Sequence, residues 1–399
     1  MATLAASLIW GINTLFLLDA GLNNTEAFAA NAFYTAGQVV FEVPTGVIAD
    51  TWGRRASYLL GSATLLVSTL LYLYMWSVEA PLWGWAIASI FIGLGFTFFT
   101  GAVEAWLVDA LAAAEFEGNL DDIFAGGQTI TGVAMLSGSV AGGFIAQATN
   151  LGVPFILRAV ILGMVLIAAW FLMHDEGFTP SRGKGPIVEV KRVLKASLDN
   201  GLRNRPMRWL MLASPFTMGV GIYAFYAMQP YLLELYGDPN AFAVAGIAAA
   251  VIAGAQIVGG LLAPFIRRIV KRRTDALIFS GVMSVVMLIV IGITSSFWVA
   301  VIALVVWSVV GSTGRPLRQA YVNGLIDSEQ RATVLSFDAL MGSAGGVVTQ
   351  PALGRAADVW GYSASYVVSG VIAAFAVPFI GLSRSENAPA DIAEDRAAV

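Results

Sequence analysis

Residues Gly46 to Arg55 read GVIADTWGRR and form a short polar loop between two long apolar segments, 27–49 and 56–77. Glycine stands at the start of the loop and again just before its two arginines, and glycine is the residue that lets a backbone turn sharply or approach closely. Each flanking segment is long enough to cross a bilayer as a helix. The loop is therefore predicted to join two consecutive membrane-spanning helices.

The rest of the chain has the composition of a membrane protein. Of its 399 residues, 58% are hydrophobic and only 12% are charged, and the mean hydropathy is +0.76. A soluble domain carries about twice that charged fraction. Because backbone groups in lipid must be paired internally, and because the apolar runs are continuous rather than alternating, we expect helices rather than a barrel.

The recurrence of apolar segments predicts an all-α membrane protein with twelve spans in two bundles of six helices. The spans are placed at 2–20, 27–49, 56–77, 83–109, 122–146, 153–173, 207–232, 242–266, 275–294, 297–320, 332–354 and 363–382. The bundles are 1–173 and 207–382. Residues 174–206 are predicted to form a cytoplasmic linker with an amphipathic helix on the membrane surface, and 383–399 a cytoplasmic tail.

The distribution of positive charge predicts the orientation. Most of the 22 lysines and arginines fall on one side of the predicted topology, and only Arg158 and Arg355 fall on the other. Lysine and arginine accumulate on the cytoplasmic side of membrane proteins. We therefore expect a multi-pass protein of the cell (plasma) membrane with both termini in the cytoplasm and with the lipid bilayer as its surroundings.

Several classes of function are disfavoured by what the sequence lacks. It has no cysteine and one histidine, His174, so we expect no metal site and no cofactor. It has no Gly-x-x-x-x-Gly-Lys-(Ser/Thr) loop and no soluble stretch for a nucleotide domain, which argues against an ATP-driven pump. The charges are sorted by side of the membrane, so nucleic acid is not an expected partner. We do not expect an enzyme.

The two halves of the chain look like weak repeats. GSVAGG runs from Gly138 to Gly143, and GSAGG runs from Gly342 to Gly346 at a similar place in the second half. Two matching six-helix halves joined by a long connector are typical of an alternating-access transporter, whose binding site lies between the halves at mid-membrane.

The loop from Gly46 to Arg55 resembles the Gly-x-x-x-Asp-(Arg/Lys)-x-Gly-Arg-(Arg/Lys) signature of the major facilitator superfamily. It departs from that signature at Thr51, where a basic residue is usual. The resemblance covers essentially the whole chain. It implies a secondary transporter that works as a monomer on a small-molecule substrate, similar to the drug/proton antiporters.

The resemblance also implies a conformational latch that holds the cytoplasmic side closed. The latch residues are Gly46, Asp50, Gly53, Arg54, Arg55 and Asp109. Asp50 would accept hydrogen bonds from the N-terminus of span eleven, near Ala332, where a negative charge is favoured. Arg54 would pair with Asp109 at the cytoplasmic end of span four. The alternative is that the two arginines merely anchor the loop at the cytoplasmic face.

Span five contains a further element, Gly138, Gly142 and Gly143, that resembles the Gly-Pro-x-x-Gly-Gly motif of family antiporters. Ser139 replaces its proline. Small residues also let helices approach closely in lipid, so helix packing explains the element almost as well. The arginine that those antiporters carry in span four is missing, since Ser89 holds its place.

Five charged residues stand out inside the predicted spans, where charges are costly and usually mark a site. They are Glu42, Glu104, Arg315, Arg318 and Asp338. We predict that Glu104 pairs with Arg315 or Arg318 across the cavity and that protonation of a carboxylate loosens the pair. A static salt-bridge network that fixes helix packing explains these charges equally well, and it is the favoured interpretation for Glu42 and Asp338 taken singly.

Spans one and seven line the cavity in the family that the chain resembles. Candidate substrate contacts are therefore Asn13 in span one and Tyr223, Tyr226 and Gln229 in span seven. Aromatic side chains in spanning helices more often serve packing or anchoring.

The sequence thus predicts export of a small, largely apolar compound in exchange for protons, because the cavity helices carry few fixed polar groups. The alternative is uptake or exchange of a polar or anionic metabolite that Arg315 and Arg318 would bind. A membrane receptor without transport would keep the same fold.

Overall fold

The computed structural model describes residues 1–116, 118–178, 203–326 and 331–392. Within these ranges the secondary structure is helical, apart from turns and one isolated bridge between Arg272 and Ile392. The linker helix predicted within 174–206 falls largely on 179–202 and lies outside the described residues. The end of the predicted tail, 393–399, lies outside them as well.

The helices of the first half follow one another with short connections. They are α1 (Ala2–Trp10), α2 (Asn13–Asp19), α3 (Asn24–Trp52), α4 (Arg54–Ser77), α5 (Leu82–Thr97), α6 (Ala102–Ala113), α7 (Leu120–Ala148) and α8 (Gly152–Leu172). The helices of the second half are α10 (Arg205–Tyr236), α11 (Phe242–Ile269), α12 (Arg273–Ile293), α13 (Phe297–Gly324), α14 (Arg331–Ala374), α15 (Ala376–Ser385) and the 3-10 helix η1 (Pro389–Asp391).

The described helices account for twelve spans. Nine segments are long and apolar enough to cross a membrane, and α1 with α2 makes a tenth that is bent by 57°. The stretch from Val334 to Ser385 counts once in this set, but Gly361, with φ of 81°, divides it into two spans. The remaining span, α3, has 29 residues and falls outside the set because polar Asn31 and Glu42 interrupt its apolar sequence. The all-α fold predicted from hydropathy is confirmed.

Two of the predicted spans are not continuous helices, which corrects the prediction. Span one breaks between Trp10 and Asn13, where Gly11 and Asn13 interrupt the apolar run from 2 to 20. Span four breaks after Thr97 and resumes at Ala102, where Gly101 has a φ of 71°. A glycine tolerates this left-handed conformation at no steric cost.

The chain divides by internal contacts into two compact units. The first is Met1–Val190 with Asn240–Ala250, and the second is Lys191–Pro239 with Val251–Val399. The start of α11 thus belongs to the first unit and the rest of α11 to the second. The bundles 1–173 and 207–382 stay a prediction.

Glycines bring α1 and α7 together in the first unit. A Cβ at Gly142 would overlap the carbonyl oxygen of Leu8, and one at Gly138 would overlap the Ser7 hydroxyl. A Cβ at Gly143 would lie 2.9 Å from the Cα of Gly246 in the first turns of α11. Close helix packing in lipid depends on such small residues. The glycines of span five therefore pack helices, whatever further part they take.

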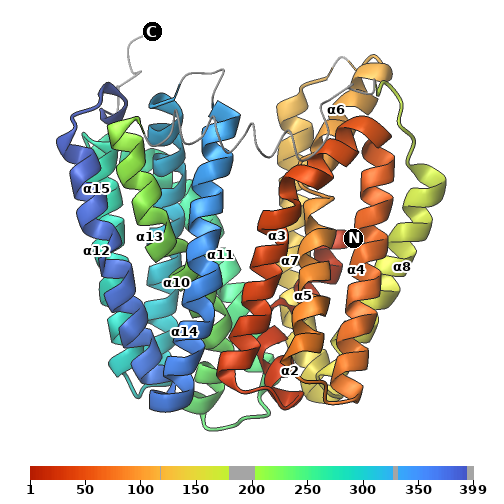
Figure 1. Ribbon diagram of the computed structural model, residues 1–399, viewed down its shortest axis with the longest axis horizontal. Coiled ribbons are helices and arrows are strands. Elements are labelled where there is room, and N and C mark those ends of the chain that lie inside the picture. Colours follow the sequence, from red (N-terminus) through yellow and green to blue (C-terminus); the bar gives the residue numbers. More distant parts are fainter. Residues whose placement is uncertain (117, 179–202, 327–330, 393–399) are drawn as a thin grey trace. The chain divides into compact units, whose positions relative to one another are not determined.

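The corresponding pair in the second unit is α10 and α14, which run side by side in Figure 1. A Cβ at Gly345 would overlap the backbone of Pro215, and one at Gly219 would lie 2.8 Å from the Cα of Gly346. The glycine runs that mark the sequence repeat, at 138–143 and 342–346, thus occupy equivalent contacts, between spans one and five and between spans seven and eleven.

Candidate functional site: intramembrane charges and the first cytoplasmic loop

The loop between α3 and α4 turns at a single residue. Gly53 has φ of 106° and ψ of 158°, a conformation that L side chains rarely adopt. The turn places Arg54 at the first position of α4, and its Nη1 lies 2.7 Å from Oδ1 of Asp50 in the last turn of α3. The predicted pair of Arg54 with Asp109 does not form. Arg54 pairs with Asp50 because the sharp turn brings the arginine back over the helix that it follows.

A different acid contacts the start of α4. Oδ1 of Asp175, just after α8, accepts a hydrogen bond of 2.7 Å from the backbone N–H of Arg55. The Arg55 guanidinium donates through Nη2 to the carbonyl of Trp170 at 2.7 Å. A Cβ at Gly53 would overlap the Asp175 carboxylate, so this glycine is required for the close approach as well as for the turn.

Asp109 lies next to the same segment after α8. Its carbonyl oxygen would be 2.9 Å from a Cβ at Gly177, and Trp106 donates through Nε1 to the carbonyl of His174 at 2.8 Å. The end of α6 is therefore held by the backbone of residues 174–177. The contact predicted between Asp50 and the start of span eleven would join the two units, and it stays a prediction.

Arg318 and Asp338 form a two-bond ion pair within the second unit. Nη1 of Arg318 lies 2.6 Å from Oδ2 of Asp338, and Nη2 lies 2.7 Å from Oδ1. The Ser214 hydroxyl accepts from Nη2 of Arg318 at 2.8 Å and lies 2.9 Å from Oδ1 of Asp338. Asp338 is 7% exposed. One cluster therefore connects α10, α13 and α14.

The structure gives Arg318 a partner that the sequence did not predict. Both terminal nitrogens of Arg318 are bonded to Asp338, which lies on the next span and makes the two-bond contact that a guanidinium favours. Glu104 is exposed in the first turn of α6 and makes no ion pair with the described residues of the first unit. Its place near a helix N-terminus favours its negative charge. The predicted pair of Glu104 with Arg315 or Arg318 would join the two units, and it stays a prediction.

The other two predicted intramembrane charges also make no ion pair with the described residues of their own units. Glu42, in α3, and Arg315, in α13, are both exposed. The side chain of Arg315 lies one turn before that of Arg318 on the same helix. Arg318 is held by Asp338, and Arg315 is not.

The candidate contacts in span seven pack within the second unit. Tyr223 is fully buried and donates to the Ser365 hydroxyl at 2.6 Å. Gln229 is fully buried, and the Tyr226 ring lies 5.3 Å from that of Phe225. Asn13, at the start of α2, donates to Oδ1 of Asn31 in α3 at 3.1 Å. Asn31 is not among the predicted site residues, although an asparagine within an apolar segment is visible in the sequence.

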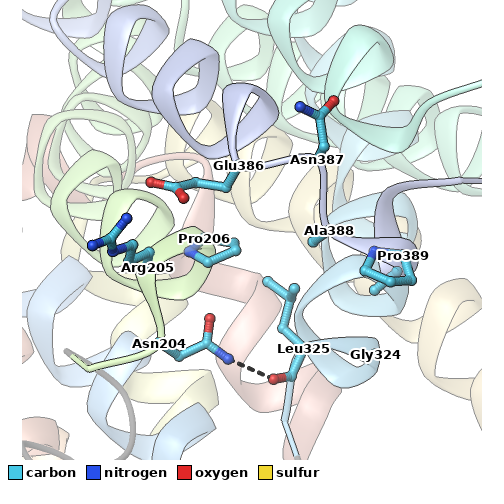
Figure 2. A pocket seen from close by; sticks show the side chains of 10 residues that line it. Asn204, Arg205, Pro206, Gly324, Leu325, Glu386, Asn387, Ala388 and Pro389 are labelled. Atoms are coloured by element: carbon cyan, nitrogen blue, oxygen red, sulfur yellow. Dashed lines mark hydrogen bonds between the residues drawn. The ribbon is translucent and has the colours of Figure 1, made fainter.

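A cleft of about 470 Å³ opens at the ends of α10, α13 and α15 (Figure 2). Asn204 and Arg205 line one side, and Glu386 and Asn387 line another. Asn204 bridges the cleft wall by donating through Nδ2 to the carbonyl of Leu325 at 2.7 Å. The cleft lies where residues 386–390 pass over the second unit. In the described residues, no group of three or more His, Asp or Glu side chains is placed to hold a metal ion.

Comparison with known proteins decides the family. The sequence matches the family model described as Major Facilitator Superfamily over residues 1–274 and 260–397. The chain belongs to the major facilitator superfamily. It is therefore a membrane transporter of this family.

Three relatives illustrate the range of similarity. An uncharacterized MFS-type transporter of Methanocaldococcus jannaschii is 24% identical over 56% of this chain, and the match spans 56% of that protein. A class G tetracycline resistance protein of Vibrio anguillarum is 23% identical over 76% of this chain and 73% of its own length. A class C tetracycline resistance protein of Escherichia coli is 32% identical over 36% of this chain and 34% of its own length.

Solved structures share the fold of this facilitator. A single-residue mutant of the nucleoside transporter NupG superposes with a TM-score of 0.79 at 12% identity, over 96% of this chain and 97% of that chain. The xylose transporter XylE of E. coli in an inward-open conformation superposes with a TM-score of 0.68 at 13% identity, over 95% of this chain and 94% of that chain.

Proposed function

We propose that this facilitator exports a small, largely apolar compound in exchange for protons, and that the Arg318–Asp338–Ser214 cluster is where the proton acts. The cluster carries the proposal because it places a buried carboxylate inside a span against one arginine. Intramembrane acids of this kind are costly and usually serve ion pathways or substrate coupling. The partial similarity to tetracycline resistance proteins supports export of a drug-like compound.

Protonation of Asp338 would change all of the cluster's bonds. The neutral acid keeps an acceptor oxygen but loses the charge that holds both lobes of Arg318. Ser214 would then be released to bond the Leu210 carbonyl, which already lies 3.1 Å from its hydroxyl. Because the three residues lie on α10, α13 and α14, one proton would loosen the contact between three spans.

Transport in proteoliposomes with an imposed pH gradient tests this proposal, with tetracycline as the first probe of a panel of apolar compounds. The wild type is expected to accumulate a panel member only when the gradient is present. Asp338→Asn should still bind the compound but should lose its response to the gradient. An unchanged response in Asp338→Asn would remove this residue from the coupling. Accumulation against a gradient would also exclude a receptor that does not transport.

Arg318→Lys separates coupling from a static packing role. A lysine keeps the charge but cannot make two parallel bonds to Asp338. Under the coupling proposal the pH dependence of transport shifts while the protein still folds. Under a packing role, stability falls and the pH dependence of the remaining transport stays that of the wild type.

A second candidate is uptake or exchange of an anionic metabolite at Arg315. It is favoured by one observation, that Arg315 is exposed and has no ion pair with the described residues of the second unit. Arg318 is a weaker candidate for an anion, because Asp338 and Ser214 already occupy its terminal nitrogens. Counterflow with candidate anions, compared between the wild type and Arg315→Lys, distinguishes this function from export of an apolar compound.

The proposal includes the latch and the orientation predicted from the sequence, with a monomer in the cell (plasma) membrane and both termini in the cytoplasm. The chain has no cysteine, so single cysteines can report sidedness directly. A membrane-impermeant maleimide should label Glu79→Cys in intact cells and should label Glu386→Cys only after permeabilisation. The reverse pattern would overturn the orientation.

A further inference from the structure

Span one is broken next to a buried pair of amides in the first unit. α1 ends at Trp10, α2 begins at Asn13, and the two helices meet at 57°. Asn13 is 8% exposed and Asn31, across from it on α3, is 4% exposed. Discontinuous helices at mid-membrane are a recurrent feature of transporter binding sites.

The pair uses only part of its hydrogen-bonding capacity. Nδ2 of Asn13 donates to Oδ1 of Asn31 at 3.1 Å. Nδ2 of Asn31 is buried and, among the residues that the structure describes, has no acceptor. Nearly all buried polar side-chain atoms in proteins have a partner, and the membrane interior offers little water in place of one.

Other buried polar side chains of α3 find hydrogen-bond acceptors on their own helix, whereas the Nδ2 of Asn31 does not. The Thr35 hydroxyl donates to the carbonyl of Asn31 at 3.1 Å. The Thr45 hydroxyl, farther along the helix, lies 2.8 Å from the carbonyl of Phe41 and 3.2 Å from that of Thr97. Threonines can satisfy themselves on their own helix in this way. The Asn31 side chain instead uses its carbonyl oxygen to accept from Asn13 in the broken span, and its Nδ2 has no acceptor among the described residues.

We propose that Asn31 is a substrate contact, and that its Nδ2 donates a hydrogen bond to a neutral oxygen, a carbonyl or hydroxyl, on the transported compound. The inference rests on the proposed function and adds a chemical feature to the substrate. The two amides carry no charge themselves, so the pair suits a neutral acceptor on an otherwise apolar molecule. Two short helices joined at Gly11 and Ile12 can separate where one continuous helix cannot, and this movement would open the donor to the compound.

Binding to the purified protein tests the proposal. The probes are tetracycline and apolar ring ketones, together with matched hydrocarbons that lack oxygen. Asn31→Leu keeps the size of the side chain and removes the donor. It is expected to weaken binding of the oxygen-bearing probes about tenfold, the effect of one lost hydrogen bond. Binding of the hydrocarbons should not change, and a purely structural role for Asn31 would not separate the two sets.

Two further variants guard against misfolding. Asn31→Leu leaves Asn13 without its acceptor, so the double variant Asn13→Leu with Asn31→Leu removes both amides, a change that folded proteins tolerate well. It should fold and show the same selective loss. Thr45→Val, the matched control on α3, should bind all probes as the wild type does.

The outcomes distinguish this inference from the proposed function. If the wild type binds the oxygen-bearing probes and both Leu variants bind them equally well, Asn31 is not a substrate contact, and the proposed function is unaffected. If the wild type binds none of the probes, the proposed function fails and this inference fails with it. If both Leu variants lose binding of the oxygen-bearing probes and keep binding of the hydrocarbons, the result supports this inference and the proposed function.

Discussion

In each half of the chain, an aspartate that follows the sixth span caps the N-terminus of the third span. Asp175, after α8, caps α4, and Asp391, after α15, caps α12. The two aspartates differ in burial. Asp175 bonds the N–H of Arg55 at 2.7 Å and is half-buried. Asp391 bonds both the N–H and the hydroxyl of Thr274, at 2.8 and 2.7 Å, and is 1% exposed. In each case the N–H belongs to the second residue of the helix, α4 or α12.

The internal repeat therefore includes the N-terminal caps of α4 and α12 as well as the spans themselves. Each cap is made across the fold, over a sequence separation of 120 residues in the first half and 117 in the second. A carboxylate at a helix N-terminus satisfies free N–H groups and is favoured by the helix dipole. The partly exposed cap lies beside the Asp50–Arg54 pair of the signature loop, and the buried cap has no such loop. We therefore expect the first corner, where Asp175 caps α4, to rearrange more readily than the second corner, where Asp391 caps α12.

Asp391→Ala should have the largest effect on stability. It leaves two buried donors of Thr274 without their acceptor, which costs about 3 kcal/mol of unfolding free energy. Denaturant titration of the purified protein in micelles measures this. Asp391→Asn, which keeps one acceptor oxygen, should lose about half as much. A stability equal to that of the wild type in Asp391→Ala would contradict the view that this corner rearranges less readily than the first.

Gly53→Ala should have the second largest effect and lower the unfolding free energy by about 2 kcal/mol. The residue has a positive φ, and a Cβ would overlap the Asp175 carboxylate. Gly21→Ala is the matched control, since Gly21 has φ of 88° and no atom within 4 Å of its Cβ position. It carries the backbone cost alone and should be less destabilising. If the same titration gives equal losses for both variants, the contact with Asp175 contributes nothing.

Asp175→Ala should lower the unfolding free energy by about 1 kcal/mol, which is the usual effect of removing a helix cap. Water can partly replace this cap because Asp175 is only half-buried. In a Gly53→Ala background the loss should be smaller, because removing the carboxylate also relieves the overlap. The two substitutions are therefore expected to be non-additive. A loss in Asp175→Ala as large as that in Asp391→Ala would erase the difference between the corners.

Arg54→Ala should have the smallest effect on stability, about 0.5 kcal/mol or less, because its ion pair with Asp50 is partly exposed. If the first corner is a latch, the variant nevertheless changes the rate of transport in proteoliposomes. A charge-reversed pair, Asp50→Arg with Arg54→Asp, should restore part of that rate. Wild-type transport in Arg54→Ala would leave the arginine as a simple anchor of the loop.

The spans and the signature loop could be predicted because hydropathy and glycine spacing are local properties of the sequence. The turn at Gly53 is such a case. The break in span one was not predicted, because the segment 2–20 is apolar enough as a whole to form one span, although Gly11, Asn13 and Thr14 interrupt it. The two helix caps could not be predicted from the sequence either, because Asp175 and Asp391 lie more than a hundred residues along the chain from the helices that they cap.

The partner of Arg318 within its own unit was not foreseen, for a different reason. Relating spans four and ten through the repeat favoured a pair of Glu104 with Arg315 or Arg318, which would join the two units and stays a prediction. Asp338 lies on the next span, 20 residues along the chain, and can reach the arginine within one bundle. Adjacent spans with opposite charges were visible in the sequence, and their proximity in the chain was the better guide.

Proton release on substrate binding tests the coupling claim most directly. A compound that the wild type transports is added to the detergent-purified protein in weak buffer, and the pH is followed. The wild type is expected to release protons, and Asp338→Asn is expected to release none while still binding the compound. Equal proton release by both proteins would contradict the assignment of coupling to the Arg318–Asp338–Ser214 cluster.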